Sequence, residues 1–164
     1  MADTIEFIMT SLCDTHALAE KISSLLQAGD LLALEGDLGV GKSAFARALI
    51  RAYRSDPKTE VPSPTFTIVQ SYEAAGKPDI WHADLYRLSD PEELYELGLE
   101  EVRDDSVVVV EWPDRLDKAW REEALTLKFE ILPASDDVEE LPRAITLCVP
   151  PAWADRLGSL KARV

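Results

Sequence analysis

Eight consecutive residues carry the clearest chemical pattern in this 164-residue chain. The pattern is Gly-x-x-x-x-Gly-Lys-Ser, and its residues are Gly36, Asp37, Leu38, Gly39, Val40, Gly41, Lys42 and Ser43. Glycines tolerate positive φ angles, which turn successive backbone N–H groups towards one point and form a cup for an anion. The lysine reaches the β- and γ-phosphates of a nucleotide, and the hydroxyl after it ligates Mg²⁺. The spacing therefore predicts a phosphate-binding loop.

A magnesium ion in such a loop needs a second protein anchor, usually an acid at the end of a neighbouring apolar strand. Glu111 follows four consecutive valines, and Asp84 closes the segment 80–84. Because Glu111 ends the more hydrophobic run, we predict that it holds Mg²⁺ together with Ser43. Asp84 is the rival ligand, and it can instead orient the attacking water. Each acid has a plainer interpretation, as a strand-end or turn-capping carboxylate.

The nucleotide and the reaction are less tightly defined. The chain contains no asparagine, so it cannot form the Asn-Lys-x-Asp clamp that binds guanine, and ATP is the expected nucleotide. A small-molecule kinase is one alternative to an ATPase, because Arg47, Arg51, Arg54 and Arg87 are available to bind an acceptor. Arginines on a helix more often lie on a solvated face, which is our expectation for the first three. A nucleotide-gated binding module is the third alternative.

The composition, 46% hydrophobic and 29% charged, is that of a globular protein, and the length fits a single domain spanning residues 1–164. No apolar run approaches the roughly 18 residues that cross a bilayer. The first residues lack the basic start and apolar core of a secretory signal, so we expect a cytoplasmic protein without a membrane partner. Cys13 and Cys148 have no metal-like spacing, and we expect reduced thiols.

The formal net charge is −14, and residues 90–123 hold thirteen acids against four bases. A protein that grips nucleic acid needs a basic surface, because neutralising phosphates supplies most of the non-specific affinity. The charge therefore predicts that the chain does not bind DNA and meets RNA only indirectly, through a partner protein. Simple solubility is the plainer explanation of an acidic surface.

Apolar periodicity predicts alternating strands and helices, and so a three-layer α/β domain of the P-loop NTPase type. We expect a mostly parallel central sheet with late antiparallel strands. The predicted strands are 4–8, 31–34, 67–72, 80–84, 107–110, 125–132 and 144–149. The predicted helices are 14–26 with Asp14 or Thr15 as its cap, 42–53, one that begins within 89–93, and a terminal one carrying Trp153, Leu157 and Leu160. Three prolines make 55–64 a loop.

Four segments together resemble the TsaE family, the bacterial ATPases of tRNA threonylcarbamoyladenosine biosynthesis. The first is the phosphate loop itself. The others are Val-Pro-Ser-Pro-Thr-Phe-Thr at 61–67, His-Ala-Asp-Leu-Tyr-Arg-Leu at 82–88 and Glu-Trp-Pro at 111–113. Their order and spacing agree from about residue 14 to residue 113, and the tail beyond residue 116 shows no such likeness.

The resemblance implies a P-loop α/β fold, ATP and Mg²⁺ as cofactors, and a weak, partner-dependent ATPase activity. The implied partner is a TsaB–TsaD-like complex, which transfers a threonylcarbamoyl group to N6 of adenosine 37 in tRNA. The ATPase then contacts tRNA only indirectly, in agreement with the acidic charge.

The resemblance also implies roles for single residues. The nucleotide-binding set is the eight residues of the loop together with Thr65, in a switch-like segment near the γ-phosphate, and Trp112, beside the nucleotide. The catalytic set is Lys42, Asp84 and Glu111, and the metal ligands are Ser43 and Glu111. We expect His16 and His82 to be structural.

Overall fold

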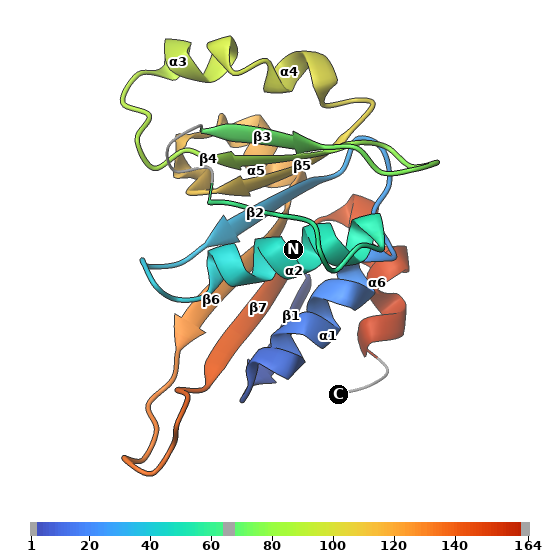
Figure 1. Cartoon of the computed structure of the whole chain (residues 1–164). Coiled ribbons are helices and arrows are strands. Elements are labelled where there is room, and N and C mark those ends of the chain that lie inside the picture. Colours follow the sequence, from blue (N-terminus) through green and yellow to red (C-terminus); the bar gives the residue numbers. More distant parts are fainter. Residues whose placement is uncertain (1–2, 64–67, 162–164) are drawn as a thin grey trace.

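The computed structural model describes residues 3–63 and 68–161, which form one seven-stranded sheet with helices on both faces (Figure 1). The strand order is β1-β7-β6-β2-β5-β4-β3. The strands are β1 (Asp3–Met9), β2 (Leu31–Glu35), β3 (Val69–Tyr72), β4 (Ile80–Asp84), β5 (Val107–Glu111), β6 (Leu125–Ile131) and β7 (Arg143–Val149). The central strands β6, β2, β5 and β4 are parallel to one another, whereas β1, β7 and β3 pair antiparallel. The predicted α/β fold class is confirmed.

The apolar runs of β2 and β5 are continuous because both faces of these strands are covered. On one face, Leu32 and Val109 belong to a core that also includes residues of α1 (Leu12–Ser23), α2 (Lys42–Arg54) and α6 (Ala154–Lys161). On the other face, Ala33 and Val108 pack in a second core with Leu99 of α4 (Leu99–Val102). Leu94 of α3 (Pro91–Glu96) and Trp120 of α5 (Lys118–Glu123) flank this second core. These two cores make the three layers.

The N-caps of α1 and α3 are polar side chains that bond the backbone of the first helical turn. The N-cap of α1 is Ser11, whose hydroxyl accepts a hydrogen bond from the backbone N–H of Asp14. The prediction of Asp14 or Thr15 as the cap is therefore wrong, because the helix begins one turn earlier than its apolar stripe indicates. α3 begins within 89–93 as predicted, and its cap is Asp90, whose side chain accepts a hydrogen bond from the backbone N–H of Glu92. Within the described residues, no helix is both long and apolar enough to cross a membrane.

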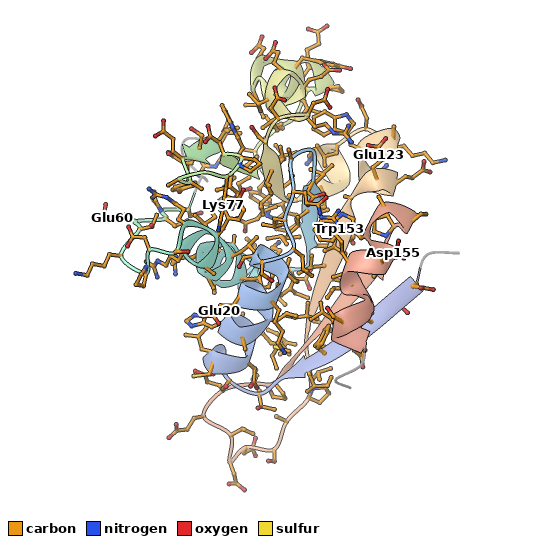
Figure 2. The ribbon with its side chains drawn as sticks, turned by 90° about the vertical axis from the view of Figure 1, so that its right-hand side faces the viewer. Glu20, Glu60, Lys77, Glu123, Trp153 and Asp155 are labelled. Atoms are coloured by element: carbon orange, nitrogen blue, oxygen red, sulfur yellow. The ribbon has the colours of Figure 1, made fainter. Side chains whose placement is uncertain are left out.

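The last third of the chain completes the sheet. β6 lies parallel to β2 and antiparallel to β7, so the antiparallel part of the sheet begins between β6 and β7. The loop that joins these two strands extends away from the rest of the molecule (Figure 1). After β7, a 3₁₀ turn (Pro151–Trp153) leads into α6, and Figure 2 shows Trp153 at this point. Trp153 and Leu157 are buried, as predicted for a packed terminal helix.

An ion pair fastens α6 to the start of β2. The guanidinium of Arg156 donates two hydrogen bonds to the carboxylate of Asp30, at 2.7 and 2.9 Å, and a third to the carbonyl of Leu25 at 2.8 Å. It also lies 3.9 Å from the centre of the Trp153 ring. Only 7% of Asp30 is exposed, so its charge depends on this partner.

We expect Arg156→Ala to lower the free energy of unfolding by about 2–4 kcal/mol, because the Asp30 carboxylate would remain buried without its partner. Urea denaturation measures the change. Lys118→Ala is the control, because its ion pair with Glu122 spans 3.6 Å on an exposed surface and should contribute less than about 1 kcal/mol. Equal effects of the two substitutions would show that the Arg156 pair is not a structural anchor.

Candidate functional site

The phosphate loop has the backbone that its sequence predicts. It connects the end of β2 to the start of α2, and Gly36, Gly39 and Gly41 have φ angles of 148°, 76° and 110°. The N-cap of α2 is Gly41, which has no side chain to cap the helix and so leaves the N–H groups of its first turn available to an anion. Val40 is buried under the loop, whereas Leu38 is 70% exposed at its tip.

Gly36 is needed for close packing as well as for its φ angle. A Cβ atom at this position would lie 2.8 Å from the carbonyl oxygen of Phe129 in β6 and 2.8 Å from Cγ1 of Val40. Any larger residue would therefore push the loop away from β6. The first glycine thus fixes where the loop leaves the sheet.

The parallel register brings the two predicted acids to the same edge of the sheet. Glu111 of β5 is level with Leu34 of β2 on one side and with Asp84 of β4 on the other. The carboxyl ends of β2, β5 and β4 therefore meet beside the phosphate loop, which is where ligands bind in open α/β sheets. The expected proximity of Glu111 to the loop is observed.

Glu111 makes the contact that joins the loop to this edge. Its carboxylate is only 2% exposed, and Oε1 accepts a hydrogen bond from the Ser43 hydroxyl at 2.9 Å. Oε2 lies 2.7 Å from Nε2 of His82, which is 1% exposed. Burial opposes the ionisation of Glu111, but hydrogen bonds from His82 and Ser43 and the charges of His82 and Lys42 together hold its pKa below the ordinary value. The sequence did not indicate His82 as a partner of this acid, although alternation along β4 places His82 and Asp84 on one face.

Two contacts within the chain hold Lys42 inside the loop. Its ammonium donates a hydrogen bond to the carbonyl of Gly36 and lies 3.6 Å from the centre of the Trp112 ring. Burial lowers the pKa of Lys42, and the nearby acids, chiefly Glu111 and Asp84, oppose that shift. Trp112 has a left-handed backbone, with φ of 59°, and its ring also contacts Tyr86. The structure therefore places Trp112 beside Lys42.

Asp84 sits at the end of β4 in a tightly bonded turn. Its Oδ1 accepts a hydrogen bond from the backbone N–H of Tyr86 at 3.0 Å, and only 7% of the residue is exposed. The next backbone N–H, of Leu85, donates to the carbonyl of Glu111 at 3.1 Å. The two acids are thus tied together through the backbone. Thr65, the remaining predicted site residue, lies outside the described residues.

The three arginines of α2 were expected on a solvated face. Instead, each of them donates hydrogen bonds to the loop that follows the helix. Arg47 donates to the carbonyl of Val61 at 3.4 Å, and Arg51 donates to the carbonyl of Thr59 at 2.9 Å. Arg54 donates to the hydroxyl of Thr59 in the same loop at 3.2 Å, and also to the carbonyl of Glu73, just after β3, at 2.7 Å. That expectation was therefore incomplete, because helical spacing alone does not reveal a loop that returns along the helix.

Comparison with known proteins agrees with this arrangement. A family model described as "Threonylcarbamoyl adenosine biosynthesis protein TsaE" matches residues 9–139. A solved structure, "Crystal structure of Bacillus subtilus YdiB", superposes with a TM-score of 0.75 at 26% identity, covering 99% of this chain and 97% of that one.

Three relatives are each named "tRNA threonylcarbamoyladenosine biosynthesis protein TsaE". The protein of Rickettsia conorii is 42% identical over 101 residues, which is 62% of this chain and 57% of that protein. The protein of Rickettsia felis is 35% identical over 73% of this chain and 68% of its own length. The protein of Bacillus subtilis is 35% identical over 78% of this chain and 77% of its own length.

The fold and the site thus define an α/β protein with a P-loop at the carboxyl edge of the parallel core of a mixed sheet. Within that class, the chain belongs to the TsaE family of tRNA threonylcarbamoyladenosine biosynthesis.

We expect Gly36→Ala to lower the free energy of unfolding by about 2–4 kcal/mol, because the new methyl group would overlap Phe129 and Val40. Thermal or urea unfolding measures the loss. Gly76→Ala is the control, since Gly76 has a φ of 71° with nothing within 4 Å of the added Cβ. It should cost only about 1–2 kcal/mol of backbone strain. A smaller loss for Gly36→Ala than for Gly76→Ala would contradict the close packing.

Proposed function

We propose that this chain is the Mg²⁺-dependent, ATP-binding and ATP-hydrolysing subunit of the machinery that installs threonylcarbamoyl on adenosine 37 of tRNA. Family membership supplies the pathway. The observation that carries the ATPase activity is the hydrogen bond between Ser43 in the phosphate loop and Glu111 at the end of β5. A loop hydroxyl of the type that ligates magnesium and a buried acid 68 positions away meet at 2.9 Å.

The donor set suits magnesium. Mg²⁺ prefers oxygen ligands, keeps several waters, and is usually bound through one or two carboxylates together with substrate phosphates. The Ser43 hydroxyl and the Glu111 carboxylate supply one oxygen each, and Glu111 is held as a carboxylate by its neighbours. When bound, the ion would neutralise charge on the β- and γ-phosphates.

Each of the remaining groups has a task in hydrolysis. The backbone N–H groups of residues 36–41 and of the first turn of α2 bind the phosphates, and Lys42 binds their outer oxygens. Asp84, level with Glu111, orients the water that attacks the γ-phosphate. Trp112 lies against Lys42 and borders the nucleotide. The role of Thr65 as a switch residue is proposed from the resemblance alone.

The partner is proposed to be a TsaB–TsaD-like protein complex. A chain of net charge −14 is poorly suited to hold tRNA but can dock on a protein that does. The nucleotide state would control that docking, because switch segments of nucleotide hydrolases are ordered by contacts to the γ-phosphate and released on hydrolysis. The same partner affinity with ATP, with ADP and without nucleotide would contradict this control.

A small-molecule kinase remains the main alternative. A hollow of about 780 Å³ between α1 and α2, which is lined by Arg47 and Arg51 among others, offers a place for an acceptor. Both arginines already donate to carbonyls of the following loop, so their contacts are explained without an acceptor. The ATPase proposal therefore needs fewer assumptions, and the next experiment separates the two.

We expect a purified TsaB–TsaD-like pair to stimulate phosphate release from ATP, and we expect Lys42→Ala to abolish that stimulation because the phosphates lose their cationic contact. A coupled phosphate assay measures both. Lys58→Ala is the control, since Lys58 is exposed in the loop after α2. A rate of ATP turnover that is unchanged by the partner proteins but depends on an added acceptor would favour the kinase.

We expect Asp84→Asn to bind ATP within about threefold of the wild-type affinity but to hydrolyse it about 100-fold more slowly, because the water loses its orienting carboxylate. Calorimetry with a non-hydrolysable analogue gives the affinity, and single-turnover assays give the rate. Asp105→Asn removes the same charge at an exposed position and should change neither quantity. Weakened binding with an unchanged rate would reassign Asp84 to the metal or the nucleotide.

A further inference from the structure

His82 is a buried histidine in a central strand, with one partner and one unused ring nitrogen. Its Nε2 lies 2.7 Å from Oε2 of Glu111, and both residues are almost fully buried. Among the described residues, its Nδ1 is buried without a hydrogen-bond partner. A buried polar atom without a partner is costly, so an apolar residue would serve packing alone better at this position. The presence of a histidine at this position is therefore explained by the contact of its Nε2 with Glu111.

The register of the strands explains why a ring of this length is needed. His82 in β4 is level with Val109 in β5, and Glu111 is two residues further along β5. The contact is therefore diagonal, and only a long side chain reaches such a neighbour across a sheet. A carboxylate accepts hydrogen bonds but cannot donate one, so in a contact with ionised Glu111 the Nε2 atom of His82 is the donor.

The two oxygens of Glu111 consequently have different partners. Oε2 is held towards the sheet interior by His82, and Oε1 is directed at the Ser43 hydroxyl in the phosphate loop. Without His82, the carboxylate could rotate and exchange its two oxygens. Groups that hydrogen-bond a metal-ligating side chain orient it, and their loss typically weakens metal affinity by about 10- to 100-fold.

We propose that His82 is a positioning residue, which locks the Glu111 carboxylate so that Oε1 faces Ser43 and the magnesium ion. This inference rests on the proposed function, because it assumes that Ser43 and Glu111 bind the ion. His82 is only 1% exposed, so the proposal assigns it no contact with the nucleotide or the metal. Its action is on the geometry of Glu111 alone.

The test compares His82→Leu, which removes the donor, with His82→Gln, whose amide can donate from a similar position. Mn²⁺ replaces Mg²⁺, and electron paramagnetic resonance gives its affinity for each protein bound to a non-hydrolysable ATP analogue. We expect His82→Leu to bind Mn²⁺ about 10- to 100-fold more weakly and His82→Gln to recover most of this loss. Affinity for the analogue in the presence of a chelator should change less than about twofold, because phosphate contacts remain.

Val109→Ala is the matched control. It disturbs the core at the position level with His82 but leaves the contact with Glu111 in place. An equal loss of Mn²⁺ affinity in Val109→Ala would overturn the proposal, as would wild-type affinity in His82→Leu. Failure of the wild-type protein to bind the analogue or Mn²⁺ would instead refute the proposed function.

A measurement on the wild-type protein tests whether His82 donates to Glu111 even if His82→Leu does not fold. The chain has only two histidines, so ¹⁵N-labelled imidazole spectra contain two rings, and His16→Ala identifies the signals of the buried one. We expect His82 to carry its proton on Nε2. A ring protonated only on Nδ1 could not donate to Glu111, and this result would overturn the proposal.

Discussion

The buried carboxylate of Glu111 is the interaction on which the site depends. A charge that is 98% removed from solvent is tolerated only when donors and an opposite charge surround it. Here the donors are Ser43 from the start of α2 and His82 from β4, with the Lys42 charge nearby. Together with Glu111 of β5, these groups come from three separate segments. They meet only if β2, β5 and β4 keep their parallel register, so the site and the sheet stabilise each other.

β2 is accordingly secured at both ends. At its amino end, Asp30 accepts two hydrogen bonds from Arg156, and its carbonyl accepts from the backbone N–H of Val108. At its carboxyl end, Gly36 lies so close to Phe129 that no Cβ would fit. Arg156 and Phe129 both lie beyond residue 116, where the sequence showed no motif of the family, although the family model extends to residue 139 and so includes Phe129. This part of the chain therefore holds in place the strand that presents the phosphate loop.

The sequence predicted what depends on local spacing. The phosphate loop, the valine run before Glu111 and the bounds of β4 follow from glycine conformation and apolar alternation, and all were found. His82 with Glu111 and Arg156 with Asp30 were not predicted, because these pairs are separated by 29 and 126 residues and depend on register and on helix placement. The cap of α1 was misplaced for a local reason, because several polar residues precede the apolar stripe and only backbone geometry selects Ser11.

The groups proposed to bind ATP and magnesium already have partners within the chain. Lys42 donates to Gly36 and faces Trp112, and Ser43 donates to Glu111. A ligand must therefore replace these contacts. Replacing one hydrogen bond with another contributes less free energy than giving a partner to a polar group that has none. Lys42 would give up a carbonyl and an aromatic face for phosphate oxygens, and Ser43 and Glu111, which would hold the ion, would give up their mutual hydrogen bond. Nucleotide and metal binding then each disturb groups that the other uses, so the two events should be coupled through this small cluster.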